Sequence, residues 1–390
     1  MVDFDDAELM KSTDRETSSM TLAIYSGSFD PVTFGHLDLI ERAARAFADL
    51  EVVVGNNPAK HYIFSLDERL RFLRHAIRNP RVRTWKIENQ LLADHAFEVG
   101  ASIIVKGVRG IQDYDYERMM HEINITQQRG IDTHILIARR ELNHVSSSAV
   151  KELCRYQGLT HEYVPLIVKE ALERRLNDQV ILGLTGGIGC GKSYLGEQLV
   201  EQGRARGLNV HNIDFDRIAH DLLLGRQERV YQELRAQICV RFGLAALDRK
   251  ALGTIVFSDP EKLTCLNEMM RVPLLTRLRA ELAGKKGVLL INAALLAEAD
   301  LLHLCNKNVI LVTAEESVRM ERLRGRGLSD EQIWRRLASQ YTTEEKRQKI
   351  EQRIAEAHWG RCVEVTSNGA FEPGRLAGLL DQMVDNAGAK

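Results

Sequence analysis

Residues 180–193 read VILGLTGGIGCGKS. The first five residues are mostly apolar and predict a buried strand, and the last eight fit G-x-x-x-x-G-K-[ST], the phosphate-binding P-loop. The glycines of such a loop expose backbone N–H groups to phosphates, and its lysine reaches the outer phosphates of a nucleoside triphosphate. A strand, this loop and a following helix are typical of a parallel α/β sheet, so the segment indicates both a fold and a ligand class.

A second strand-to-helix corner lies upstream, where residues 23–36 read AIYSGSFDPVTFGH. Gly27 lets the backbone approach a ligand closely, and Asp30-Pro31 fixes a turn. His36 lies near the expected helix N-terminus, where unpaired N–H groups and the helix dipole favour an anion. A histidine in that place can bind a phosphate oxygen and stabilise charge that develops in a transition state. We therefore expect two nucleotide sites in one chain.

The composition is typical of a globular protein. The chain has 390 residues, of which 44% are hydrophobic and 27% charged, and its formal net charge is −1. This length predicts two domains, and the near-neutral charge gives no indication of nucleic acid or an anionic membrane as a partner. No apolar stretch approaches the roughly 18 residues of a membrane span. Six scattered cysteines without a C-x-x-C pair indicate free thiols in a reducing cytoplasm.

The order of apolar segments predicts an α/β fold with two doubly wound parallel sheets. In the first half we expect strands at 22–25, 51–54, 102–105 and 134–138, and helices at 35–47, 66–77 and 146–156. In the second half we expect strands at 180–184, 208–213, 287–292 and 308–312, a helix at 192–203, a helical block to about residue 283, and charged helices from 315 to 357. Polar residues 1–19 predict a disordered extension without a signal peptide. The two domains are expected at 20–176 and 177–390, with ligands beyond the carboxyl ends of the strands.

From about Thr21 to Leu176 the sequence resembles the T-x-G-H nucleotidyltransferases, and specifically the phosphopantetheine adenylyltransferases. Besides residues 23–36, the blocks that carry the resemblance are Asn57-Pro58-Ala59-Lys60, Gly107-Val108-Arg109-Gly110, Asp113-Tyr114-Asp115-Tyr116-Glu117 and Val145-Ser146-Ser147-Ser148. The resemblance implies a Rossmann-like domain that joins ATP and 4′-phosphopantetheine and releases pyrophosphate. The attacking phosphate is already ionised at neutral pH, so positioning and charge neutralisation with Mg²⁺ would suffice without a general base.

The resemblance also implies roles for individual residues. His36 would bind ATP and stabilise the transferring phosphoryl group, and Lys60 would act on the acceptor phosphate. The implied ATP contacts are Ser28, Phe29, His36, Gly107, Val108, Arg109, Glu117, Leu142, Asn143, His144, Val145, Ser146, Ser147 and Ser148. The implied phosphopantetheine contacts are Ser28, Lys60, Leu92 and Lys106, with Leu91 beside them. Lys106 stands where the family often has arginine, which keeps the charge but loses the bidentate fork.

From about Val180 to Met383 the sequence resembles the dephospho-coenzyme A kinases. The P-loop is followed by Ile213-Asp214-Phe215-Asp216, which matches the D-x-D of that family. An Asn-Lys-x-Asp element, which GTPases use to read guanine, is not complete at Asn306-Lys307-Asn308-Val309, and this argues against GTP. The resemblance implies that ATP phosphorylates a ribose 3′-hydroxyl, with Asp216 as the base.

The same resemblance implies the kinase site. Its ATP contacts would be Gly187, Ile188, Gly189, Cys190, Gly191, Lys192 and Ser193, with Arg322 and Arg326 on a lid helix. Lys192 would contribute to catalysis, and Mg²⁺ would be held by Ser193 and, through water, by Asp214. The segment Asn368-Gly369 resembles a strand end that borders the adenine. Three departures from the family pattern are Arg271-Val272-Pro273 in place of His-Pro, Ala294 in place of a proline in Ala294-Leu295-Leu296-Ala297-Glu298, and Cys190 in the P-loop.

The two implied reactions are consecutive, and a fusion of such domains resembles bifunctional coenzyme A synthase. Three alternatives stay open: a nucleotidyltransferase with another acceptor fused to a small-molecule kinase, an active adenylyltransferase with a degenerate nucleotide-binding kinase-like module, and a nucleotide-gated scaffold. The expected partners are the small molecules ATP, 4′-phosphopantetheine and dephospho-coenzyme A. Stand-alone relatives of the first domain form symmetric oligomers, so we also expect a homo-oligomer.

Overall fold

The computed structural model describes residues 22–57, 60–127, 130–257, 259–338 and 340–385. The chain divides into two compact units, Met1–Ser147 and Ser148–Lys390. The extension expected at residues 1–19 lies outside the described residues. Within the described ranges, no helix is both long and apolar enough to cross a membrane.

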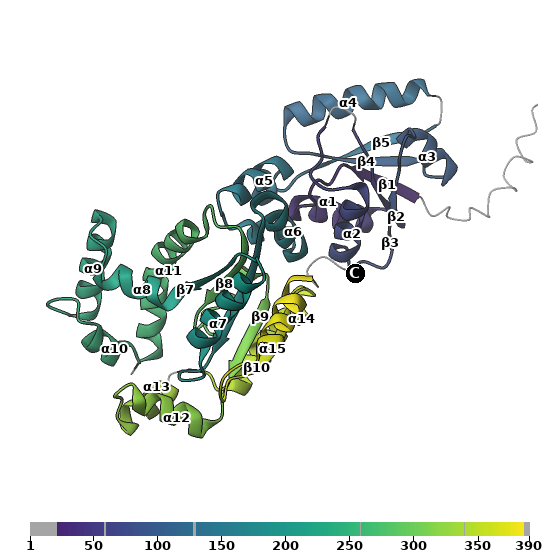
Figure 1. Cartoon of the computed structure of the whole chain (residues 1–390). Helices are drawn as coiled ribbons and strands as arrows, with labels where there is room; N and C mark the ends of the chain where they lie inside the picture. Colours follow the sequence, from purple (N-terminus) through teal and green to yellow (C-terminus); the bar gives the residue numbers. More distant parts are fainter. Residues whose placement is uncertain (1–21, 58–59, 128–129, 258, 339, 386–390) are drawn as a thin grey trace, which may run out of the picture. The chain divides into compact units, whose positions relative to one another are not determined.

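The N-terminal unit is built on a parallel sheet with the strand order β3-β2-β1-β4-β5 (Figure 1). The strands are β1 (Leu22–Gly27), β2 (Asp49–Val54), β3 (Val82–Lys86), β4 (Ile103–Val108) and β5 (Asp132–Ile137). The helices are α1 (Phe34–Ala46), α2 (Leu66–Ala76), α3 (Leu92–Glu98) and α4 (Ile111–Thr126), and α5 (Ser147–Arg155) begins at the end of the unit. Because β1 lies between β2 and β4, the carboxyl ends of β1 and β4 flank the switch point where such sheets bind ligands.

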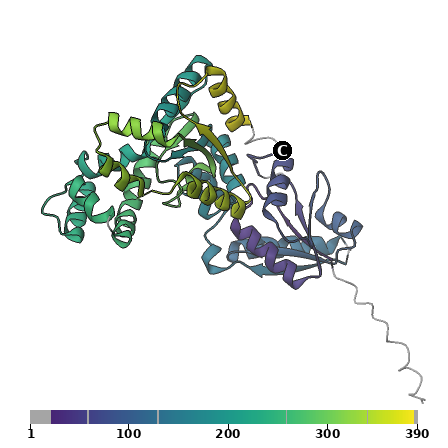
Figure 2. The same ribbon diagram turned by 90° about the horizontal axis from the view of Figure 1, so that it is seen from below.

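The C-terminal unit contains a second parallel sheet, with the order β10-β9-β6-β8-β7. Its strands are β6 (Gln179–Gly186), β7 (Val210–Asp214), β8 (Gly287–Asn292), β9 (Asn308–Thr313) and β10 (Arg361–Thr366). Its helices are α6 (Leu166–Asn177), α7 (Lys192–Ala205), α8 (Phe215–Leu224), α9 (Arg229–Phe242), α10 (Arg249–Phe257), α11 (Pro260–Leu282), α12 (Glu316–Gly325), α13 (Asp330–Ala338), α14 (Thr343–Ala357) and α15 (Pro373–Asp385). Both views show α8 to α11 gathered as one helical group, with α12 and α13 as a separate pair (Figure 1; Figure 2).

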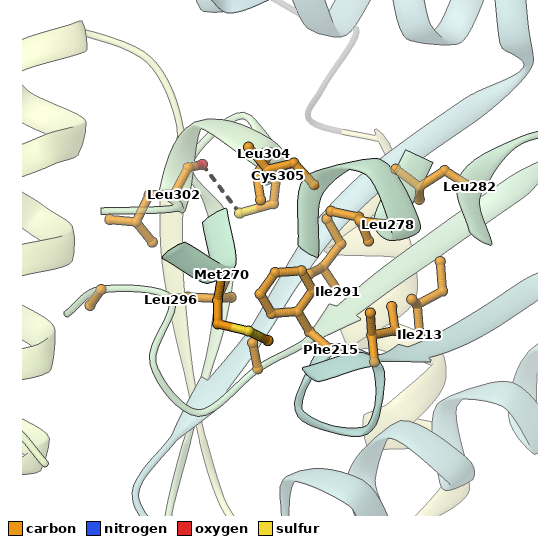
Figure 3. Packing of buried hydrophobic residues seen from close by; sticks show 14 of the residues in the cluster. Ile213, Phe215, Met270, Leu278, Leu282, Ile291, Leu296, Leu302, Leu304 and Cys305 are labelled. Carbon is orange, nitrogen blue, oxygen red and sulfur yellow. Dashed lines mark hydrogen bonds between the residues drawn. The ribbon is translucent and has the colours of Figure 1, made fainter. Parts of the chain in front are cut away.

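The helical group α8 to α11 shares a core with this second sheet. Figure 3 shows Phe215 of α8, Met270 and Leu278 of α11 and Ile291 of β8 in one apolar cluster, and none of these four is more than 6% exposed. The short 3-10 helix η3 (Leu302–Cys305) adds to the cluster, and within it the Cys305 thiol donates a hydrogen bond to the carbonyl of Leu302 at 3.3 Å. The sheet and the helical group therefore form one folding unit.

Helix α6 is fixed to the second sheet by buried polar groups. Lys169 Nζ donates to Glu173 Oε1 at 2.6 Å and to Asn306 Oδ1 at 2.8 Å, and Asn308 Nδ2 donates to Glu170 Oε2 at 2.9 Å. Buried charges need such partners, because an unpaired one carries the whole desolvation cost. The two compact units of the structure therefore meet before α6, between residues 147 and 148. The sequence analysis places the boundary between the two functional domains between residues 176 and 177, and this boundary stays a prediction.

The predicted fold class is confirmed, and the predicted strands and helices of both units are present. Apolar periodicity did not predict β3, α3, α4, α6, β10 or α15. None of the residues of α4 is buried, so this helix has no apolar stripe to detect. Strand β3 alternates between half-buried and exposed residues, which gives an equally weak signal.

Replacing Ile291 with alanine tests the shared core. We expect Ile291→Ala to lower the free energy of unfolding of the C-terminal unit by about 2–5 kcal/mol, because it leaves a cavity at a fully buried site. The measurement is urea unfolding followed by tryptophan fluorescence in a Trp85→Phe background, where both remaining tryptophans, Trp334 and Trp359, report on this unit. The control Val240→Ala, at an 84% exposed position, should cost less than about 0.5 kcal/mol. Equal losses in the two variants would contradict the assignment.

Candidate functional sites

The first site begins at the corner between β1 and α1. Thr33 is the N-cap of α1, and its hydroxyl accepts a hydrogen bond from the backbone N–H of His36. In return, the backbone N–H of Thr33 donates to Nδ1 of His36 at 3.0 Å. The T-x-G-H segment is therefore a capping box in which histidine takes the place usually held by Glu or Gln. Its spacing follows from the reciprocal bonds between the N-cap and the third helical residue.

This hydrogen bond also fixes the chemistry of His36. Because Nδ1 accepts from a backbone N–H, the neutral ring must carry its proton on Nε2. Burial, followed by the positive charges of Arg109 and Lys60, lowers the pKa of His36 to about 4. The ring of Phe29 packs edge-on against the imidazole, with the ring centres 5.2 Å apart. At neutral pH, His36 is thus an oriented, uncharged Nε2–H donor.

A buried arginine that the sequence analysis missed ties the surrounding loops together. Arg69, on α2, is 1% exposed, and its Nη1 donates to the carbonyls of Ser28 (2.6 Å) and Gly55 (3.1 Å). Its guanidinium also lies 4.2 Å from the centre of the Tyr62 ring, whose hydroxyl is 3.2 Å from the hydroxyl of Ser28. The Ser28 backbone and side chain are therefore both held, whereas Lys60 is exposed at the rim.

The end of β4 supplies the opposite wall of the first site. Lys106 and Glu117, expected to contact different substrates, form an ion pair of 3.3 Å with each other. Asp113 Oδ2 accepts from both the backbone N–H and Nε of Arg109 (3.1 and 3.0 Å). At Gly107, an added Cβ would stand 2.3 Å from Leu39 Cδ1, so any larger residue would require the Leu39 side chain to shift. Val108 is buried beside these groups.

The segment from Leu142 to Ser147 lies next to the T-x-G-H corner. Val145 is buried, and its N–H closes a turn onto the carbonyl of Leu142 at 3.0 Å. The Ser147 hydroxyl donates to the carbonyl of Pro31 at 2.8 Å and so joins the start of α5 to the first loop. The remaining predicted contacts differ in exposure: Asn143, His144 and Ser148 are exposed, Ser146 is partly buried, Leu92 is partly buried at the start of α3, and Leu91 is 58% exposed.

The second site is the P-loop between β6 and α7. Gly191 caps α7 with φ of 91°, in the left-handed region that favours glycine. Lys192 Nζ donates to the carbonyl of Gly186 at 3.1 Å, so the lysine folds back over its own loop. Ser193 is exposed in the first turn of α7, whereas Cys190 is buried under the loop. This arrangement presents the first amides of α7, a lysine and a hydroxyl to one region, which suits a phosphate group.

Side chains from the segment after β9 form hydrogen bonds with the backbone of the P-loop. Arg322 Nη1 donates to the carbonyl of Gly189 at 3.4 Å, whereas Arg326 is exposed at the C-terminal end of α12. Arg319 Nε donates to the carbonyl of Ile188 at 3.1 Å, and Gln340 Oε1 accepts from the N–H of Ile188 at 3.1 Å. Neither Arg319 nor Gln340 was predicted. The spacing of Arg319, Arg322 and Arg326 on one helix face was the signal that could have found Arg319.

The two aspartates of the D-x-D segment differ in their partners. Asp214 is the N-cap of α8, and its Oδ1 accepts from the N–H of Arg217 at 2.9 Å. Asp216 is exposed in the first turn, and its Oδ2 accepts from the N–H of Ala294 at 3.3 Å. Asp214 pairs with Asn292 across β7 and β8, so both aspartates lie at the carboxyl ends of the sheet, as expected. Within the described ranges, no group of three or more metal-binding side chains gathers at either site.

The protonation state of His36 can be measured directly. We expect long-range ¹H–¹⁵N spectra at pH 7 to show a neutral His36 ring with its proton on Nε2, and its titration midpoint to lie near pH 4, as burial and two neighbouring cations dictate. The spectrum of His36→Gln assigns the signal. A midpoint above pH 6, or a proton on Nδ1, would contradict the capping-box geometry.

Comparisons with known proteins match a different family model to each part of the chain. Residues 180–357 match the dephospho-CoA kinase family model, and residues 24–153 match the cytidylyltransferase-like model. The phosphopantetheine adenylyltransferase of Caldanaerobacter subterraneus subsp. tengcongensis is 41% identical over 154 residues, which are 39% of this chain and 96% of that protein. The one of Chromobacterium violaceum is 44% identical over 150 residues, 37% of this chain and 92% of that protein.

Among solved structures, TT1252 from Thermus thermophilus is 29% identical, with a TM-score of 0.40, and the match covers 53% of this chain and 97% of that one. The relatives and the family models divide the chain between them, because the adenylyltransferases align with its first part and the kinase model with its second. The chain therefore belongs to the phosphopantetheine adenylyltransferase family in its N-terminal part, to which a dephospho-CoA kinase domain is fused.

Proposed function

We propose that this chain carries out the last two steps of coenzyme A synthesis. The first site joins ATP and 4′-phosphopantetheine to give dephospho-coenzyme A and pyrophosphate, and the second phosphorylates the ribose 3′-hydroxyl of that product with another ATP. The observation that carries the proposal is the pair of phosphate-binding corners, after β1 and after β6, each beside the central strand of its own sheet. A shared intermediate explains why both corners occur in one chain.

In the first reaction, a phosphate oxygen of 4′-phosphopantetheine attacks the α-phosphorus of ATP, and the bond to the leaving pyrophosphate breaks. The oriented Nε2–H of His36 would donate to an oxygen of the transferring group and stabilise the charge that develops there. Lys60 and Arg109, whose charges act on His36, would offset the charge of the phosphates. The held backbone of Ser28 would keep the acceptor loop in place, since Arg69 anchors it.

In the second reaction, the ribose 3′-oxygen attacks the γ-phosphorus of ATP, ADP leaves, and Asp216 would accept the proton of the hydroxyl. The amides of the P-loop and Lys192 would bind the phosphates of ATP. Arg319 and Arg322, which already hold the loop carbonyls, would lie beside the transferring group. Each site acts mainly by positioning and by neutralising charge.

The side chains present at the second site fit a magnesium ion. Ser193 offers a hydroxyl and Asp214 a carboxylate, and both are hard oxygen donors of the kind that Mg²⁺ prefers when it also binds ATP. Ser193 would bind the ion directly, and Asp214, one oxygen of which caps α8, would act through water. When bound, Mg²⁺ neutralises phosphate charge.

We propose the cytoplasm as the location, in keeping with six free cysteines.

Variants in one site should leave the other reaction intact. We expect His36→Ala to slow adenylyl transfer by about 10²–10³-fold, the scale of losing one transition-state donor. It should spare phosphorylation of supplied dephospho-coenzyme A. Lys192→Ala should abolish that phosphorylation and leave adenylyl transfer unchanged. Product identification by mass spectrometry, with ATP, Mg²⁺ and 4′-phosphopantetheine, measures both steps.

The same assay separates the alternatives. Turnover of another acceptor in preference to 4′-phosphopantetheine would favour a different nucleotidyltransferase. If the wild type binds ATP at the P-loop but makes no coenzyme A, the C-terminal part is a degenerate binding module. Partner capture that depends on ATP binding but not on turnover would favour the scaffold.

We also propose that the chain self-associates. The helix α4 has no buried residue, and it exposes several large apolar side chains, among them Ile111, Tyr114, Met119, Ile123 and Ile125. An apolar surface of this kind commonly marks an interface. A second copy of the same surface would cover it, as in closed symmetric oligomers.

Light scattering tests the self-association. We expect the wild type to be an oligomer and Met119→Asp with Ile123→Asp to shift it toward the monomer, because two buried charges would oppose the interface. The control Arg118→Asp with Glu122→Lys, on the same helix, reverses an ion pair without touching the apolar residues and should stay oligomeric. A monomeric wild type at micromolar concentration would refute the proposal.

A further inference from the structure

The backbone of Ala294 forms hydrogen bonds both with Asp216, the proposed base, and with Lys346 on α14, the helix that follows α12 and α13. Its N–H donates to Asp216 Oδ2 at 3.3 Å. Its carbonyl accepts from Lys346 Nζ at 2.9 Å and from the Thr185 hydroxyl at 3.3 Å. Thr185 belongs to β6, directly before the P-loop, and Lys346 to α14. Three elements that are distant in sequence therefore meet at one backbone position beside Asp216.

Lys346 is unusual among the lysines of this chain because it is fully buried. Its side chain is 0% exposed and forms an ion pair with Glu298, the last residue of the Ala294–Glu298 segment. Glu298 Oε1 also accepts from the N–H of Tyr341 at 3.3 Å, just before α14 begins. The charge of Lys346 lies close enough to Lys192 for the two to interact. Glu298 is only 15% exposed, and an ion pair as buried as this one is weak evidence for stability, so its place beside the P-loop points to another role.

We propose that Lys346 is a positioning residue for phosphoryl transfer: by holding the Ala294 carbonyl, it fixes the residue whose N–H orients the Asp216 carboxylate. Lys346 touches neither substrate in this role and acts only through Ala294. Glu298 keeps the lysine in place. The orientation of the Asp216 carboxylate therefore depends on where α14 holds Lys346. This inference rests on the proposed kinase reaction and adds to it two residues of defined function.

A simple loss of activity would not separate positioning from a structural role, so the test is a double-mutant cycle. The four proteins are the wild type, Lys346→Met, Asp216→Asn and the double variant, each assayed for kcat and KM with dephospho-coenzyme A. We expect Lys346→Met to lower kcat by about 10–100-fold, the scale of a misplaced catalytic group, with the KM for dephospho-coenzyme A unchanged within about twofold. In the Asp216→Asn background the same change should cost less than about twofold, because the group it positions is gone.

The controls keep the outcome unambiguous. Lys349→Met, on the same helix, should leave kcat unchanged, and adenylyl transfer by every variant should match the wild type. Should Lys346→Met fail to fold, the cycle is run with Lys346→Met combined with Glu298→Gln, which leaves no unpaired buried charge. Equal losses in both backgrounds, or no loss in either, would overturn the positioning role. A wild type that does not phosphorylate dephospho-coenzyme A would overturn the proposed kinase function itself, which is a separate result.

Discussion

The first turn of an α-helix leaves backbone N–H groups without partners inside the helix, and both sites depend on this constraint. At α1 the Thr33 and His36 pair satisfies two of these groups and leaves the imidazole edge to face a ligand. At α7 the cap is a glycine with no side-chain bond, so the amides stay available for phosphate. Parallel sheets place both turns beside a central strand, where the chain crosses from one side of the sheet to the other.

Buried cations keep the loops around these turns in place. Arg69 holds two carbonyls of the first site, and Lys346 holds one carbonyl of the second. Each is nearly or fully buried and gains charge-assisted bonds that offset the cost of desolvation. Since the bonded atoms belong to the backbone, the loops keep their shape whatever side chains they carry. The Ala294 departure therefore keeps its contact with Lys346, which bonds the backbone carbonyl and not the side chain.

The C-terminal unit departs from the kinase family pattern in its helical group, and its Asn-Lys-x segment differs from the GTPase element. Pro273 lies inside α11 and not at a helix end, and the neighbouring Val272 is 71% exposed. The asparagines of the Asn306-Lys307-Asn308 segment are bonded to carboxylates of α6, so they have a structural use unrelated to reading a base. Of the three departures, Arg271–Pro273 falls in the helical group, whereas Cys190 lies in the P-loop and Ala294 contacts Asp216.

The sequence by itself determined the fold class, the two phosphate-binding corners and the family, because strand–helix alternation and glycine spacing are local properties of the chain. It also placed His36 and Lys192 at helix N-termini, and Asp214 and Asp216 at a strand end. Only the tertiary structure decided the tautomer of His36, the pairing of Lys106 with Glu117, and the hydrogen bonds that Arg69, Arg319, Gln340 and Lys346 form. Most of these depend on contacts between residues distant in the chain, and all depend on burial or on the direction of a hydrogen bond, which no local spacing can encode.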